Sequence, residues 1–216
     1  MSPALRRHDL AYLRPEAPVC AGPPDEPAAT WLRDWLCTGR PLVVTRQEQG
    51  ADGVRLGAVL PARLGRRRLS CVVDHHALTR IEPPLPVAAV LEVLPRGMVG
   101  PLQALAQQAR DLGVSVGVYG STAWEKLAGE CYRRASSDLD VVCDVAQARA
   151  LSGCLSALAR ADEHAPIDGE IRFPDGRAVA WRELQRSRLA SGASVLAKDL
   201  YGVALVSVGS LLEALA

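Results

Sequence analysis

Three prolines within four residues, Pro83-Pro84-Leu85-Pro86, make the strongest break in this chain. Proline fixes φ and lacks the backbone N–H, so regular helices and central strands do not continue through such a segment. We therefore place a domain boundary there. The prediction is a smaller N-terminal domain over residues 1–84 and a larger C-terminal domain over residues 85–216.

The composition fits a well-packed core and argues against several classes of protein. Hydrophobic residues make up 49% of the 216 residues and aromatic residues only 4%, so Leu, Val and Ala must build the core. A net charge of +1 argues against a general nucleic-acid binder. No apolar run reaches the roughly 18 residues of a membrane span. The six cysteines lack zinc-site spacing and no secretory leader precedes them, so we expect reduced thiols and a cytoplasmic protein.

The first 84 residues combine strand and helix patterns. Trp31 and Trp35 belong to an apolar series at helical spacing, and Thr30 is the expected N-cap. The expected elements are a proline-rich loop over 15–27, a short helix after Thr30, strands over 41–45 and 69–73, and either a strand or a helix over 56–60.

Helix and strand patterns alternate after the proline run. Pro174-Asp175-Gly176 stands between two strand-like segments and indicates a hairpin turn, because glycine readily adopts positive φ. The pattern predicts an α+β fold with a mixed sheet and flanking helices, preceded by a smaller α+β domain. The expected elements are helices over 102–112, 122–128 and 146–160, strands over 114–119 and 138–143, hairpin strands over 167–173 and 177–181, short strands over 195–198 and 203–208, and a closing helix.

Two carboxylates alternate along one predicted strand. In Ser137-Asp138-Leu139-Asp140, strand geometry places Asp138 and Asp140 on the same face, roughly 7 Å apart along the chain. Such a pair can converge on a hard cation such as Mg²⁺. We therefore predict that Asp138 and Asp140 are catalytic and bind a metal ion, Mg²⁺ or, alternatively, Mn²⁺.

A Gly-Ser pair precedes this strand, at the junction between another strand and a helix. The first N–H groups of a helix lack partners, and the helix dipole favours an anion there. Gly120 would allow a phosphate to approach the backbone, and Ser121 can donate its hydroxyl. A phosphate-binding turn beside a metal-binding acid pair is what nucleotidyl transfer requires.

The segment from Val118 to Val141 resembles the nucleotidyltransferase signature. In detail, its YGSTAWE start and its Tyr-x4-Ser-Asp-Leu-Asp end resemble the phosphoribosyl-dephospho-CoA transferases of the malonate decarboxylase system. The motifs at 168–170, 174–176 and 181–183 also fit that family. The resemblance is good over roughly residues 115–200, whereas the N-terminal part matches only in outline.

The resemblance implies a nucleotidyltransferase-like catalytic domain over 85–216, behind an accessory domain. It implies an enzyme that uses 2'-(5''-triphosphoribosyl)-3'-dephospho-CoA. This enzyme would transfer the phosphoribosyl-dephospho-CoA prosthetic group to a serine of the apo acyl carrier protein of malonate decarboxylase and release diphosphate. The family's acid pair corresponds to Asp138 and Asp140. Two other functions stay open: a nucleotidyltransferase with another donor, such as AMP transfer to a small molecule or protein, and a non-catalytic nucleotide-binding module.

Other side chains are candidates for the same site. Polymerase-like transferases commonly use a third carboxylate from a neighbouring strand, and we favour Glu170 as a metal ligand over Asp168 because Glu170 is nearer mid-strand. Lys198 is a candidate for the substrate phosphates, with an ordinary surface lysine as the alternative. Trp124 is a candidate for stacking on adenine, with core packing as the alternative.

The densest basic stretch consists of Arg63, Arg66, Arg67 and Arg68. Acyl carrier proteins are generally acidic, so this cluster is a candidate docking surface for the carrier protein. The alternatives are contacts with the donor's phosphates and a solvated surface without a partner.

Overall fold

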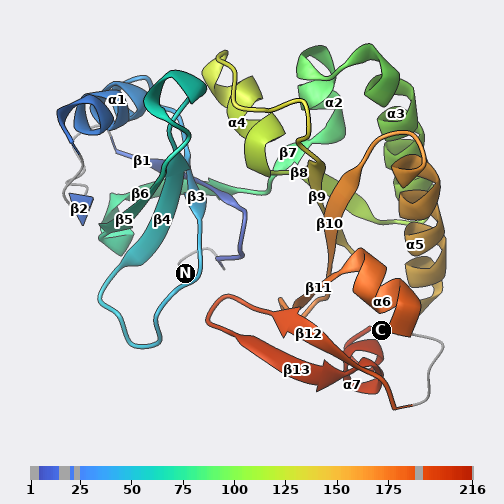
Figure 1. Ribbon diagram of the computed structural model, residues 1–216. Coiled ribbons are helices and arrows are strands. Elements are labelled where there is room, and N and C mark those ends of the chain that lie inside the picture. The colour runs from blue at the N-terminus through green and yellow to red at the C-terminus, as the bar shows by residue number, and fades with distance from the viewer. Residues whose placement is uncertain (1–4, 15–19, 22–24, 188–191, 216) are drawn as a thin grey trace.

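The chain forms two β-sheets, each with its own helices (Figure 1). The computed structural model describes residues 5–14, 20–21, 25–187 and 192–215. The predicted α+β class is confirmed, and the chain passes from the first sheet to the second at residues 83–84.

The N-terminal sheet has six strands in the order β2-β5-β4-β3-β1-β6, and all of its pairs are antiparallel. The segment 56–60, for which the sequence left strand and helix open, lies mainly in a strand. The elements are β1 (Leu10–Leu13), β2 (Cys20–Ala21), α1 (Glu26–Cys37), β3 (Leu42–Val44), β4 (Val54–Val59), β5 (Arg68–Val73) and β6 (Leu78–Glu82), with 3₁₀ turns at Ala62–Leu64 and His75–Ala77.

The first helix begins earlier than predicted. Asp25, rather than Thr30, is its N-cap, because the Asp25 carboxylate accepts a hydrogen bond from the N–H of Ala28 at 3.1 Å. Pro27 lies in the first turn, where a missing N–H costs nothing. The expected loop is therefore wrong at residues 26–27, and residues 15–19 and 22–24 lie outside the described part.

The C-terminal sheet has seven strands in the order β13-β12-β11-β10-β9-β8-β7, and only β9 and β10 pair in parallel. The strands are β7 (Leu85–Pro86), β8 (Ser115–Val118), β9 (Leu139–Asp144), β10 (Ile167–Arg172), β11 (Ala178–Ala180), β12 (Ser194–Lys198) and β13 (Val203–Ser207). The helices are α2 (Val87–Val90), α3 (Arg96–Asp111), α4 (Gly120–Ala128), α5 (Ala148–Asp162), α6 (Trp181–Ser187) and α7 (Val208–Leu212), with a 3₁₀ turn at Leu91–Val93.

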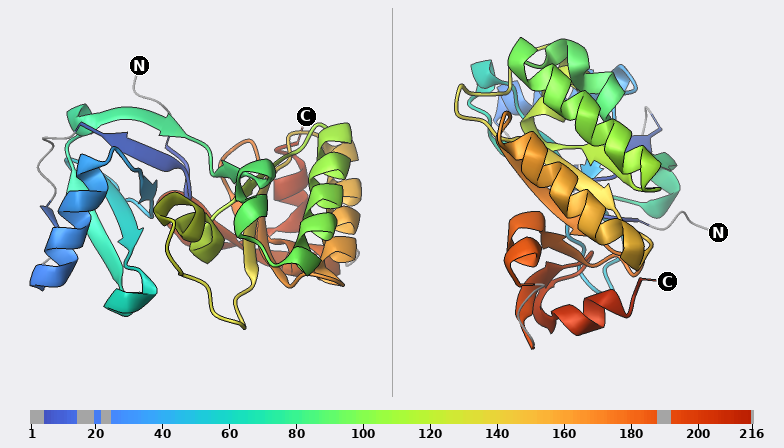
Figure 2. Two further views of the ribbon diagram at one scale, coloured as in Figure 1. Left: turned by 90° about the horizontal axis from the view of Figure 1, so that it is seen from above. Right: turned by 90° about the vertical axis from the view of Figure 1, so that its right-hand side faces the viewer.

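The helix that connects the parallel strands, α5, lies beside α3 (Figure 2). The predicted break over 83–86 is too long, because β7 uses Leu85 and Pro86 to pair with β8. A proline is tolerated there because β7 is the edge of the sheet. Among the described helices, none has both the length and the apolar character needed to cross a bilayer.

One helix of the C-terminal domain completes the core of the N-terminal domain. Trp124 of α4 is buried with the apolar residues of the first sheet, and its ring centroid lies 5.3 Å from that of Trp35 on α1. Tyr132 also stacks on Trp124, with ring centroids 6.2 Å apart. Core packing therefore accounts for the burial of Trp124, and the two domains share an apolar interface.

We expect Trp124→Ala to lower the free energy of unfolding by about 3–5 kcal/mol, because it leaves a cavity between two aromatic rings. Urea denaturation measures this loss. Leu205→Ala is the matched control, since Leu205 is 71% exposed and should change stability by no more than about 0.5 kcal/mol. Equal losses in both variants would contradict the shared core.

Candidate active site

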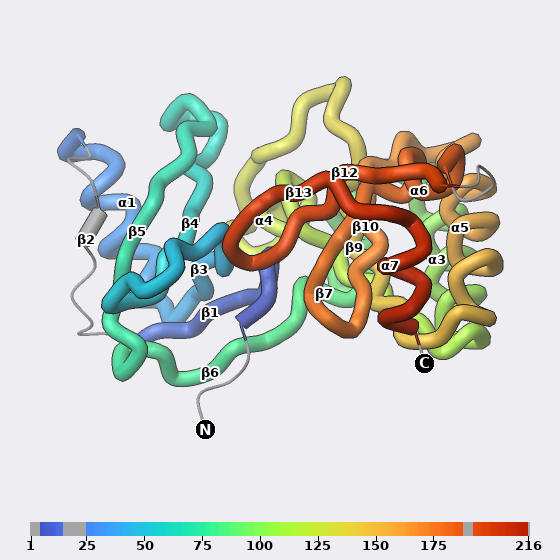
Figure 3. The backbone as a smooth tube through the Cα atoms, turned by 90° about the horizontal axis from the view of Figure 1, so that it is seen from below, coloured from blue at the N-terminus to red at the C-terminus, as the bar shows by residue number. Residues whose placement is uncertain are grey.

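A cleft of about 750 Å³ separates the N-terminal sheet from α4 and the end of β8. Its N-terminal wall comes from β3, β4 and β5. Its C-terminal wall includes Tyr119, Gly120, Ser121 and Asp140, so the predicted Gly-Ser turn and one member of the predicted acid pair face the same space. Figure 3 shows the β12–β13 hairpin reaching the N-terminal domain, where the N–H of Gln47 donates to the carbonyl of Leu200 at 2.8 Å.

Asp140 lies on β9, and its side-chain carboxylate reaches the start of α4. Gly120 has φ +66°, and a Cβ atom at this position would lie 1.8 Å from Oδ2 of Asp140. The backbone N–H of Ser121 favours the ionised form of the same carboxylate and so lowers its pKa. Glycine is therefore needed at 120 for the close approach of Asp140, and a side-chain carboxylate already faces the helix N-terminus where we expected phosphate.

Two further carboxylates act on Asp140 at this point. β9 begins at Leu139, so Asp138 precedes the strand and is exposed. Asp168 on β10 lies directly beside Asp140 in the parallel register. Burial raises the pKa of Asp140, the charges of Asp168 and Asp138 raise it further, and the N–H of Ser121 lowers it, with a result of about 6.

This donor set fits a hard divalent cation, because a cation would relieve the repulsion among the carboxylates. In the part of the chain that the structure describes, no three His, Cys, Asp or Glu side chains are grouped closely enough to hold a metal ion. Asp138, Asp140 and Asp168 would therefore have to converge around an ion when it binds.

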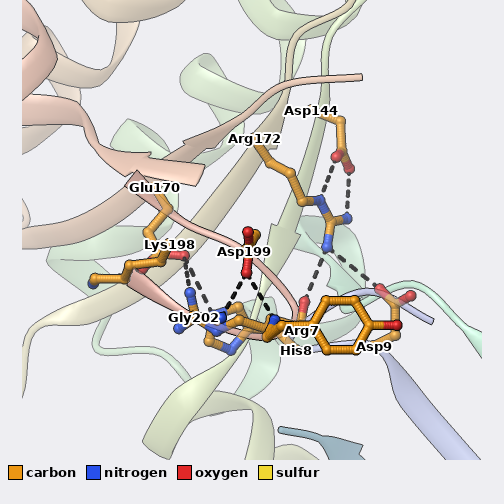
Figure 4. Close-up of polar contacts among 10 residues, drawn as sticks. Arg7, His8, Asp9, Asp144, Glu170, Arg172, Lys198, Asp199 and Gly202 are labelled. Carbon is orange, nitrogen blue, oxygen red and sulfur yellow. Dashed lines mark hydrogen bonds and ion pairs between the residues drawn. The ribbon is translucent and has the colours of Figure 1, made fainter. Parts of the chain in front are cut away.

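Glu170 has different surroundings from Asp168. Its side chain is buried, and its carboxylate lies 2.8 Å from Lys198 Nζ, 3.4 Å from His8 Nε2 and 3.6 Å from an Arg7 guanidinium nitrogen (Figure 4). Burial opposes ionisation, but the contacts with His8 and Lys198 and the charge of Arg7 outweigh it and lower the pKa of Glu170 to about 2. The carboxylate that we favoured as a metal ligand is thus held by cationic side chains, and Lys198 is part of that ion pair.

A second charged array, on the same strand, reaches the N-terminal segment. Arg172 is 3% exposed and donates to Asp144 at 2.6 and 2.9 Å. Its remaining nitrogen donates to the carbonyl of Arg7 at 3.0 Å and lies 3.5 Å from Asp9 (Figure 4). Residues 7–9 are thereby attached to the C-terminal sheet.

His8 lines the cleft although no sequence pattern singled it out. Its backbone has φ +73°, and its ring stacks on Tyr119 with centroids 3.9 Å apart. Burial lowers the pKa of His8, and the nearby charges of Glu170 only partly oppose this effect. A lone histidine near the N-terminus gives no sequence signal, because its position depends on contacts with strands more than a hundred residues away.

The basic stretch divides among different surroundings. Arg63 pairs with Glu130 at 2.8 Å, and Arg67 pairs with Asp25 at 2.7 Å. Arg66 and Arg68 line the cleft instead. The four arginines therefore divide between ion pairs and the cleft, and their contact with a carrier protein stays a prediction.

Comparison with known proteins identifies the family. The model for the N-terminal domain of the phosphoribosyl-dephospho-CoA transferase MdcG matches residues 6–84, and the model for its C-terminal domain matches residues 85–209. A phosphoribosyl-dephospho-CoA transferase of Xanthomonas euvesicatoria is 38% identical over 184 residues, which cover 82% of this chain and 84% of the relative. The chain belongs to the phosphoribosyl-dephospho-CoA transferase family.

A more distant member of the family extends the match over more of the chain. The phosphoribosyl-dephospho-CoA transferase of Bradyrhizobium diazoefficiens is 30% identical over 206 residues, which cover 93% of this chain and 89% of the relative. No solved structure matches this chain significantly. The similarity to family members therefore includes the N-terminal domain, where the motifs that we recognised matched only in outline.

We expect Gly120→Ala to reduce transferase activity roughly hundredfold, because the added methyl group must displace the Asp140 carboxylate. Gly129→Ala at the other end of α4 is the matched control. Gly129 has nearly the same φ, +68°, but nothing lies within 4 Å of its Cβ position. This control should lose about 1–2 kcal/mol of stability from backbone strain and keep its activity. Equal activity in the two variants would show that the position of Asp140 is not critical.

Proposed function

We propose that this chain transfers the phosphoribosyl-dephospho-CoA group from 2'-(5''-triphosphoribosyl)-3'-dephospho-CoA to a serine of the apo acyl carrier protein of malonate decarboxylase. One observation carries the proposal: Asp140 lines the cleft at the N-terminus of α4, opposite an arginine-rich wall, and Asp168 lies beside it in the sheet. Membership of the family supports the choice of donor and acceptor. The cytoplasmic location stays a prediction.

In the proposed reaction the serine Oγ attacks the phosphorus of the donor that is attached to the ribose. The new Oγ–P bond forms as the bond from this phosphorus to the outer diphosphate breaks, and the serine proton is lost. Such a transfer depends mainly on positioning and on neutralising phosphate charge. The cleft arginines would hold the phosphates in place, beside the carboxylates at the start of α4.

Mg²⁺, or alternatively Mn²⁺, would neutralise phosphate charge when bound. Asp138, Asp140 and Asp168 would hold this ion. Asp168 replaces our earlier choice of Glu170, because Asp168 is the neighbour of Asp140 in the sheet whereas Glu170 is surrounded by cationic groups. Nothing in the site favours a different donor, such as one that supplies AMP, or a binding-only role.

We expect Asp138→Asn and Asp140→Asn each to abolish transfer while the fold is retained, because an amide does not supply the charge that a hard cation requires. The assay is mass spectrometry of apo carrier protein after incubation with the donor and Mg²⁺. Asp111→Asn, at the exposed end of α3, is the control and should keep full activity. Near-normal turnover in either site variant would refute the metal site.

A comparison of Asp168→Asn with Glu170→Gln tests which of the two residues is the third metal-binding carboxylate. Asp168→Asn should abolish transfer and weaken Mg²⁺ binding with little change in stability. Glu170→Gln should instead lower stability at neutral pH, because it leaves Lys198 and Arg7 without their carboxylate partner.

The pH dependence of unfolding separates the two carboxylates further. Because the pKa of Glu170 is lowered to about 2 from 4.5, its contribution of about 3 kcal/mol is present above pH 4.5 and is lost as the pH falls towards 2. Glu170→Gln should remove this part of the pH dependence, measured by urea denaturation from pH 2 to pH 7. Loss of metal binding in Glu170→Gln, with Asp168→Asn unaffected, would restore Glu170 as the ligand.

A further inference from the structure

The cleft wall opposite Asp140 is basic. Five of the residues that line the cleft are arginines, and only one, Asp140, is acidic. Such an imbalance favours an anionic ligand, because the arginines repel one another unless an anion lies between them. The arginines of this cleft are Arg46, Arg55, Arg66, Arg68 and Arg134.

These five arginines do not all have the same freedom to bind a ligand. Arg66 donates to the carbonyls of Tyr132 and Arg133, and Arg55 lies 3.1 Å from the carboxylate of Glu48. In contrast, no hydrogen bond or ion pair joins the guanidinium groups of Arg46, Arg68 and Arg134 to another described residue. Within the described part of the chain, these three guanidinium groups are therefore available to bind a ligand.

Arg68 begins β5 of the N-terminal sheet and lines the same cleft as Asp140 of the C-terminal sheet. A guanidinium group in this position can bind two phosphate oxygens at once. An anion that reaches the start of α4 would therefore meet the N-terminal wall as well.

We propose that Arg46 and Arg68, together with Arg134, bind the triphosphate of the donor, so that the N-terminal domain forms part of the active site. This inference rests on the proposed function for the identity of the donor. Its chemistry follows from the leaving group, because the departing diphosphate gains negative charge as its bond to phosphorus breaks. The guanidinium groups that line the cleft would stabilise that charge.

The basic stretch itself supplies matched controls. Arg63 and Arg67 are neighbours of Arg68 in the sequence, but they pair with Glu130 and Asp25 and do not line this cleft. A general loss of positive charge should therefore affect all of these variants alike, whereas a triphosphate site should respond only to the cleft arginines.

The first experiment is calorimetric titration of the full chain with inorganic tripolyphosphate and Mg²⁺. Arg68→Ala and Arg46→Ala should each weaken binding roughly ten- to a hundredfold, and Arg63→Ala and Arg67→Ala should leave it unchanged. Thermal unfolding of each variant checks that the fold is retained. Equal affinity in all variants, or an equal loss in the controls, would overturn the proposal.

The second experiment is steady-state transfer to the carrier protein, with each substrate varied in turn. Arg68→Ala should raise the KM for the donor and leave the KM for the carrier protein unchanged. A rise only for the carrier protein would instead make the cleft arginines a docking surface and overturn the proposal. If the wild-type chain binds tripolyphosphate through these arginines but modifies no carrier protein, the anion site stands and the proposed acceptor is wrong.

Discussion

The cleft of the candidate active site depends on buried ion pairs that join the two domains at β10. Arg172 is almost completely buried, and it would be strongly destabilising without partners. Asp144 supplies one partner from the C-terminal sheet, while Asp9 and the carbonyl of Arg7 supply others from the N-terminal segment. Because these bonds are directional, they fix where the segment before β1 lies, and β1 in turn positions the N-terminal sheet opposite Asp140.

Apolar packing also joins the same two domains, but unlike the ion pairs it is not directional. The rings of Trp35, Trp124 and Tyr132 lie in one core, and their burial favours association without specifying one orientation closely. The contacts of Arg172 and Glu170 select the orientation within that association. Together they explain how a cleft lined with polar side chains can lie between two domains that are firmly attached.

Local sequence patterns predicted most elements of this fold and failed where distant residues decide. The alternation of Asp168 and Glu170 on one strand face is visible in the sequence, but their different surroundings are not. Those surroundings depend on the parallel register of β9 and β10, which places Asp168 beside Asp140. They also depend on Arg7, which approaches Glu170 from far along the chain. The wrong start of α1 has a local cause. Asp25 and Thr30 are both suitable N-cap residues, and the sequence pattern alone does not show which of them begins the helix.

The arginines show why charge in a sequence and charge on a surface are different quantities. The chain as a whole has a net charge of +1, so its composition gives no hint of a polyanionic substrate. Folding neutralises Arg63 and Arg67 with neighbouring carboxylates and leaves Arg68 facing the cleft without a described partner. The low-dielectric walls of the cleft focus the field of the remaining arginines, which raises the local concentration of anions beside the carboxylates that would hold the metal ion. An N-terminal domain that only covered the catalytic sheet would not need this arrangement, whereas one that shares the binding of a triphosphate would.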